Sequence, residues 1–228
     1  MRTRVGRDDG SAREIRQASK STVLAVPTDL CRSEEINTLV EKTVHELGGI
    51  DILVTNTGAP PAGTFETFSD EQWQAMFELI LLSAIRLIRA VLPSMQPRHG
   101  GRIIHLVSSS VKQPIEGLLL SNALRPGVVG LAKTLSVELA PYQITVNTIC
   151  PGRILTDRLR QGSHVQKRLA QGWTEEEAFN ELAKDIPLRR IGRPEEVGAL
   201  VAFLASQQAG YITGTTIQID GGFIQSLL

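Results

Sequence analysis

Short runs of apolar and β-branched residues alternate along this chain with longer segments in which apolar residues recur with a helical period. Runs that are apolar at nearly every position are typical of strands buried on both faces of a parallel sheet, because helices cover both of its sides. Five such runs predict strands, at residues 22–26, 51–54, 102–107, 144–149 and 215–219.

Helical patterns separate these runs, and polar residues mark where the helices begin and end. Ser33, followed by two glutamates, predicts the start of a helix that Gly48 and Gly49 end after Leu47. Further helices are predicted at residues 69–95, 123–140 and 194–206, with at least one polar helix between residues 152 and 193. Strands that alternate with helices predict an α/β fold with a doubly wound parallel sheet in three layers, α/β/α. We expect one domain over residues 1–228.

The residues that directly follow the predicted strands are the candidates for ligand binding. In open parallel sheets, ligands bind beyond the carboxyl ends of the strands, where several loops meet. This rule selects Asp29, Asn56 to Gly58, Ser108 to Ser110, and Pro151 to Thr156.

Composition narrows the possible functions. Lysine plus arginine equals aspartate plus glutamate, so the formal net charge is zero and favours neither nucleic acid nor an anionic membrane as partner. The longest apolar stretch, residues 79–92, carries two arginines and is too short to span a bilayer. The two cysteines and four histidines show no metal-ligand spacing, so no metal site is expected. We expect a cytoplasmic protein that binds a small molecule.

Five segments resemble motifs of the short-chain dehydrogenase/reductase family, in order and with similar spacing. The match covers about nine-tenths of the chain, and several motifs in register are far more specific than one. The nearest subgroup is the atypical relatives of 3-oxoacyl-carrier-protein reductases. The segments are residues 51–58 (DILVTNTG), 101–108 (GRIIHLVS), 144–152 (ITVNTICPG), 192–197 (GRPEEV), and 211–222, which runs from YITG to DGG.

The resemblance implies a Rossmann-type fold, NAD or NADP as cofactor, and a small carbonyl or alcohol substrate such as a 3-oxoacyl thioester or a sugar. It also implies a homodimer or homotetramer that pairs the helices at residues 73–92 and 123–140. The positions expected to contact the cofactor are Asp29, Asn56, Gly58, Arg125, Pro151, Gly152 and Thr156.

The catalytic positions depart from the family pattern. The family uses a serine, a tyrosine that acts as general acid and base, a lysine that lowers the pKa of the tyrosine, and an asparagine that holds a water. In this register Ser108 matches the serine, but Ser121 stands at the tyrosine position and Arg125 at the lysine position. Ile80 replaces the asparagine. Pro126 next to Arg125 predicts that the helix begins here rather than passing through.

The sequence also has no Gly-rich turn of the kind that places a cofactor pyrophosphate on a helix N-terminus. Residues 1–19 resemble the end of the family's second strand–helix unit, so the first strand and its turn are not present. A truncated reading frame and a lineage that lost dinucleotide binding both explain this, and we favour truncation because a missing central strand leaves backbone groups unpaired. Two functions follow as hypotheses: an oxidoreductase with impaired activity, or a catalytically silent binding module or partner subunit.

Overall fold

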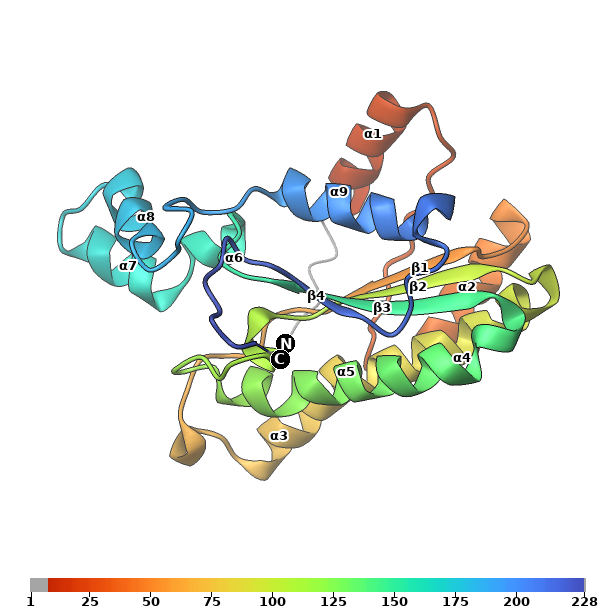
Figure 1. Cartoon of the computed structure of the whole chain (residues 1–228), viewed down its shortest axis with the longest axis horizontal. Helices are drawn as coiled ribbons and strands as arrows, with labels where there is room; N and C mark the ends of the chain where they lie inside the picture. The colour runs from red at the N-terminus through yellow and green to blue at the C-terminus, as the bar shows by residue number, and fades with distance from the viewer. Residues whose placement is uncertain (1–7, 228) are drawn as a thin grey trace.

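A parallel sheet of four strands forms the centre of the protein (Figure 1). The structure is a computed structural model, and it describes residues 8–227. The strands lie side by side in chain order, so every connection between neighbours crosses over one face of the sheet. They are β1 (Ile52–Asn56), β2 (Gly101–Leu106), β3 (Ile144–Pro151) and β4 (Thr216–Ile219). Four of the five predicted strands are thereby confirmed, with ends that differ by up to two residues.

Helices cover the two faces of this sheet and make the predicted three layers (Figure 1). On one face lies α9 (Pro194–Ala205), and α1 (Asp8–Ser19) lies on the same side of the sheet. On the other face lie α2 (Ser33–Leu47), α4 (Ser83–Met95) and α5 (Leu119–Glu138). This arrangement is the Rossmann-type α/β fold that the alternating pattern predicts.

The remaining helices surround the carboxyl ends of the strands or extend the longer helices. The predicted helix at residues 69–95 is interrupted by a π-helical turn, Glu78–Leu82, between α3 (Asp70–Phe77) and α4. Three helices, α6 (Asp157–Arg160), α7 (Ser163–Ala170) and α8 (Glu175–Ala183), follow β3. Short 3-10 turns occur at Phe65–Thr67, Gln96–Arg98, Ser109–Val111, Ala140–Tyr142 and Gln207–Ala209. Within the described chain, no helix has both the length and the apolar character that crossing a membrane requires.

The side chains of the sheet alternate between two hydrophobic layers. Ile103 packs with the helices α4 and α5, whereas its neighbour Ile104 packs against Leu204 of α9. Successive side chains of a strand point to opposite faces, so an apolar run fills both layers. Burying each such side chain fully contributes about 1.5–3 kcal/mol, which makes these two layers the main source of stability.

The predicted strand at residues 22–26 is wrong. The segment pairs with no strand in the described part of the chain, and the exposed fraction of its Leu24 side chain is 37%. A strand needs a neighbour that accepts its backbone hydrogen bonds, and an apolar run alone does not supply one. The carbonyl of Val23 instead accepts hydrogen bonds from the Arg16 side chain of α1.

The predicted start of a helix at Pro126 is also wrong, because α5 begins at Leu119 and passes through the proline. Proline removes one helical hydrogen bond, but contacts with the preceding loop hold the first turns in place. The Asn122 side chain donates to the carbonyl of Ile115 at 2.9 Å and accepts from its N–H at 3.2 Å. Leu120, which is fully buried, anchors the same turn in the core.

Candidate functional site

A cleft of about 710 Å³ opens at the carboxyl ends of the strands, between the loops that follow β1, β2 and β3 and the helices α5, α6 and α7. This is the position that the parallel-sheet rule predicts for a ligand. Six of the predicted site residues line it: Ser108, Ser121, Arg125, Pro151, Gly152 and Thr156.

Three serines form a hydrogen-bonded chain in the wall of this cleft. The Oγ of Ser108 accepts the backbone N–H of Ser110 at 3.1 Å, where the 3-10 turn after β2 begins. The Oγ of Ser110 lies 3.0 Å from the Oγ of Ser121 on α5. Ser121 is buried and reaches Ser108 only through Ser110. The hydroxyl at the family's tyrosine position is therefore tied to a neighbouring serine.

Arg125 lies one helical turn beyond Ser121, and only 5% of its surface is exposed. Its Nη1 donates to the carbonyl of Val107 at 3.1 Å, and its Nη2 to the carbonyl of Gly58 at 3.5 Å. Arg125 thus connects the segments that follow β1 and β2. Burial lowers the pKa of the guanidinium from its ordinary value, and the neighbouring Cys150 acts in the opposite direction. Burial raises the pKa of the Cys150 thiol to about 12, so this neighbour is neutral at pH 7.

Ile80 lies at the centre of the π-helical turn before α4, at the family's asparagine position. Its side chain is 98% buried and carries no polar atom. A π turn opens the helical hydrogen-bond pattern and is frequent at functional sites. Here the distortion is present, but the side chain at its centre offers no hydrogen bond to a water or a substrate.

Asn56 and Gly58 lie at the end of β1, just before Ala59 at the cleft wall. Asn56 is exposed, and a Cβ atom added to Gly58 would meet no atom within 4 Å. Both residues leave room for a ligand beside the strand. Their assignment to a cofactor remains a prediction.

Pro151, Gly152 and Thr156 follow β3 and form the opposite wall. Gly152 donates to the carbonyl of Ile219 at 3.0 Å, which holds this loop against β4. Thr156 begins α6, and its Oγ1 accepts the N–H of Leu159 at 3.4 Å. The side chain of Thr156 is exposed at the rim, where it has an additional role as a helix cap.

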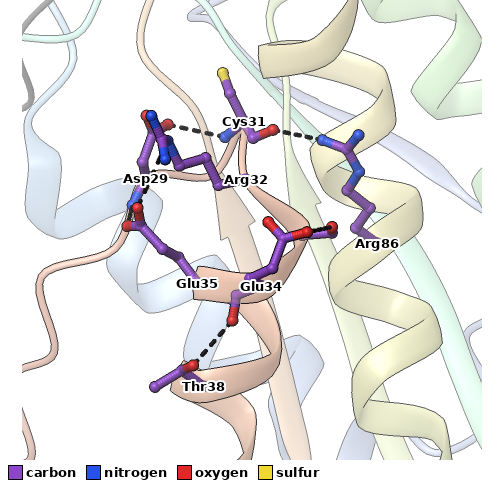
Figure 2. A network of polar contacts seen from close by, with 8 residues as sticks. Asp29, Cys31, Arg32, Glu34, Glu35, Thr38 and Arg86 are labelled. Atoms are coloured by element: carbon purple, nitrogen blue, oxygen red, sulfur yellow. Dashed lines mark hydrogen bonds and ion pairs between the residues drawn. The ribbon is translucent and has the colours of Figure 1, made fainter.

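Asp29 does not reach the cleft. Figure 2 shows it at the start of α2, where its Oδ1 accepts the N–H of Cys31 at 2.9 Å. Arg86 of α4 donates to the carbonyl of Cys31 at 2.7 Å, and Arg32 lies 3.9 Å from the other carboxylate oxygen of Asp29. The structure therefore gives Asp29 the role of a turn residue, and its contact with a cofactor stays a proposal.

Sequence reasoning missed the wall that α7 contributes. Gly162, Ser163, His164, Val165 and Gln166 line the cleft from this helix and its start. Val165 and Leu169 are spaced four residues apart and pack with Leu182 of α8, and this apolar pair was the available signal for the helix. Arg158 of α6 crosses to the carbonyl of Pro60 at 3.1 Å and so connects the two walls.

Comparison with known proteins agrees with this architecture. A family model described as enoyl-(acyl carrier protein) reductase matches residues 3–224. D-beta-hydroxybutyrate dehydrogenase of Rhizobium meliloti (strain 1021) is 35% identical over 213 residues, which cover 92% of this chain and 81% of that protein. 3-oxoacyl-[acyl-carrier-protein] reductase of Haemophilus influenzae is 36% identical over 193 residues, which cover 85% of this chain and 75% of that protein.

Solved structures show the same relationship. L-sorbose reductase from Gluconobacter frateurii, solved in complex with NADPH and L-sorbose, superimposes with a TM-score of 0.92 at 32% sequence identity. The match covers 98% of this chain and 85% of the reductase. The sheet order, the cleft at its carboxyl edge and the family match together lead to one conclusion: the chain belongs to the short-chain dehydrogenase/reductase family.

Proposed function

We propose that this protein is an oxidoreductase by descent that binds a nicotinamide cofactor, NAD or NADP, together with a small carbonyl or alcohol substrate, and that its turnover is slow. The observation that carries this proposal is the convergence of six predicted site residues on one cleft at the carboxyl edge of the sheet. The similar proteins named above include dehydrogenases and reductases, one of them solved with NADPH. A 3-oxoacyl thioester or a sugar remains the expected kind of substrate.

We propose that Pro151, Gly152 and Thr156 form the nicotinamide end of the cleft. All three line it, and Thr156 presents a hydroxyl at the rim. Pro151 and Gly152 would face the nicotinamide, and one N–H group of Arg125 would donate to a hydroxyl of its ribose. When bound, the cofactor supplies or accepts a hydride.

The polar groups of the cleft support binding better than proton transfer. Ser108 would donate a hydrogen bond to the substrate oxygen and orient the carbonyl. Ser121 is a poor proton donor, because an aliphatic hydroxyl ionises far less readily than a phenol with a pKa near ~10. Well-placed general acid–base catalysis contributes roughly 10²–10⁴-fold in rate. We therefore propose slow turnover rather than a changed reaction.

The experiment that tests cofactor binding is a calorimetric titration with NADH and NADPH. We expect dissociation constants weaker than about 100 μM for both. The 228 residues contain no Gly-rich turn to hold the pyrophosphate, and each charge-assisted contact to phosphate contributes roughly 1.5–3 kcal/mol. Nicotinamide mononucleotide serves as the comparison, since it lacks the pyrophosphate bridge and the adenosine. A low-micromolar constant for either dinucleotide would contradict this expectation.

A second candidate function is a silent binding module or a partner subunit. The specific observation that favours it is the state of the catalytic positions, where Ser121 is bonded to Ser110 and Arg125 to two backbone carbonyls. A silent module predicts ligand binding with no consumption of NADPH under any condition.

We also propose that the protein forms one domain, is located in the cytoplasm and requires no metal.

We further propose a homodimer or homotetramer that forms through α4 and α5. Gly130, Thr134 and Val137 lie on one exposed face of α5, and the exposed fraction of the Val137 side chain is 71%. Small and apolar residues at this spacing let two helices approach closely. Sedimentation velocity should show at least a dimer at micromolar concentration, and Val137→Arg should shift it toward monomer. Val44→Arg on α2 is the control, and a monomeric unmodified protein would refute the assembly.

A further inference from the structure

Arg125 is a buried cation without a carboxylate partner. The residue is 95% buried, and within residues 8–227 no aspartate or glutamate contributes to its electrostatic environment. The neighbouring Cys150 is a neutral thiol at pH 7. Burying an unpaired charge is costly, so buried charges are normally paired or coordinated. This arginine lacks the counter-charge that its burial calls for.

The donors of Arg125 are only partly used by the protein. A guanidinium carries five N–H donors in a rigid fork, and two hydrogen bonds to the carbonyls of Val107 and Gly58 account for two of them. The residue lines the cleft, as does Ser121 one turn away on the same helix. A buried cation that lines a cleft and keeps unused N–H donors favours the binding of an anionic group there.

The other charges of the cleft are compatible with an anion. Glu116 is the one acidic side chain among the described residues that line it, and it is exposed on the rim. Arg153 is paired with Asp185 at 3.0 Å and stacks over the ring of Phe223. Arg158 is bonded to the carbonyl of Pro60. Arg158 is exposed to solvent, so Arg125 is the buried cation of the cleft that has no carboxylate partner among the described residues.

The rest of the lining favours an apolar body attached to that anionic group. Five hydroxyl-bearing residues line the cleft together with Arg125, namely Ser108, Ser109, Ser121, Thr156 and Ser163, and of these Ser121 lies one turn before Arg125 on the same helix. A planar carboxylate fits the guanidinium fork with two oxygens. Apolar side chains make up much of the wall: Ile115, Leu118, Ile154, Leu159, Val165 and Phe223.

We propose that this cleft binds a small carboxylic acid with an apolar body, whose carboxylate pairs with Arg125 beside the hydroxyl of Ser121. The inference deepens the proposed function, because it names the substrate class as an oxo or hydroxy acid with a free carboxylate. It rests on the cleft being the substrate site. Binding of the acid requires neither cofactor nor turnover, so it is tested separately from the oxidoreductase activity.

The test compares an acid with its uncharged analogue in the absence of cofactor. The probes are 3-phenylpropionate and 3-phenylpropionamide, titrated by ligand-observed NMR at pH 7.5 and low salt. We expect the acid to bind the unmodified protein at least about tenfold more tightly than the amide, the effect of one charge-assisted contact. Arg125→Met should abolish this difference, and Arg125→Lys should retain part of it.

The matched control is Arg102→Met. Arg102 also donates to backbone carbonyls, those of Gly101 and Ser206, but it lies outside the cleft. We expect this variant to keep the full preference for the acid. Equal affinity for acid and amide, no binding of either at about 10 mM, or tight acid binding by Arg125→Met would overturn the proposal. If Arg125→Met does not fold, the comparison in the unmodified protein and in Arg125→Lys still decides.

Discussion

Lowering the pH from 7 to 4 is expected to reduce the free energy of unfolding by about 3 kcal/mol through one side chain, His105. This residue lies on β2 with no exposed surface, and burial lowers its pKa from the ordinary value to about 4. In the unfolded chain, its pKa returns to about 6.5. Below pH 6.5 the unfolded state binds a proton that the folded state excludes, so stability falls until the pH reaches the folded pKa.

The surroundings of His105 explain why it stays neutral. Thr55 of β1 and Thr148 of β3 lie beside it in register across the sheet. Its Nδ1 is 2.7 Å from the Oγ1 of Thr55, whereas its Nε2 and the Oγ1 of Thr148 have no partner within the described chain. No charged group among residues 8–227 offsets the burial. A protonated imidazole would therefore be a buried and unpaired cation.

Urea denaturation at several pH values between 7 and 4 measures this effect. In His105→Asn, the free energy of unfolding should fall by about 3 kcal/mol less between pH 7 and 4 than in the unmodified protein, because the substitution removes the group that titrates. His45→Asn, at an exposed histidine of α2, is the control for the loss of one histidine from the chain. Identical slopes for the unmodified protein and His105→Asn would show that His105 is not the source.

Gly152→Ala is expected to lower the free energy of unfolding by about 2 kcal/mol, the usual cost of inserting an atom into a packed position. The added Cβ would lie 2.6 Å from the Cβ of Asp220 and 2.8 Å from its Cα. Asp220 has little freedom to move, because its two carboxylate oxygens accept the N–H groups of Gly222 and Ile224. The backbone at residue 152 therefore lies so close to Asp220 that this position in the cleft wall requires glycine.

Gly58→Ala, in the segment that follows β1, provides the matched comparison. Its added Cβ meets no atom within 4 Å, so stability should change by less than about 0.5 kcal/mol. If Gly58 leaves room for a ligand, the alanine variant should bind that ligand more weakly without losing stability. Chemical denaturation of both variants distinguishes the two roles, and equal destabilisation would refute this division.

The sequence predicts the parts of this structure that local patterns control. Four apolar runs became strands, and the boundaries of α2 and α9 follow their polar and glycine signals. The run at residues 22–26 shows the limit, because a strand depends on a partner that local sequence does not specify. Pro126 shows another, since the Asn122 contacts and the buried Leu120 hold α5 together beyond the reach of propensity.

The candidate site was predictable in position but not in its internal contacts. The rule for parallel sheets and the family register brought Ser108, Ser121 and Arg125 to one cleft. Neither could show that Ser121 bonds to Ser110, or that Arg125 is buried without an acidic partner. Both features arise where α5 packs against the segments that follow β1 and β2, and such contacts between distant parts of the chain are visible only in the folded protein.

The central claim is that this family cleft binds its ligands but lacks an effective proton donor at Ser121. Its most direct test is the oxidation of millimolar NADPH by the unmodified protein with 3-oxoacyl thioesters, simple ketones and oxo acids. The account predicts a rate roughly 10²–10⁴-fold below that of a family member with the tyrosine in place, and no further loss in Ser121→Ala. Rapid turnover that Ser121→Ala abolishes would contradict it, because Ser121 would then be the group that transfers the proton.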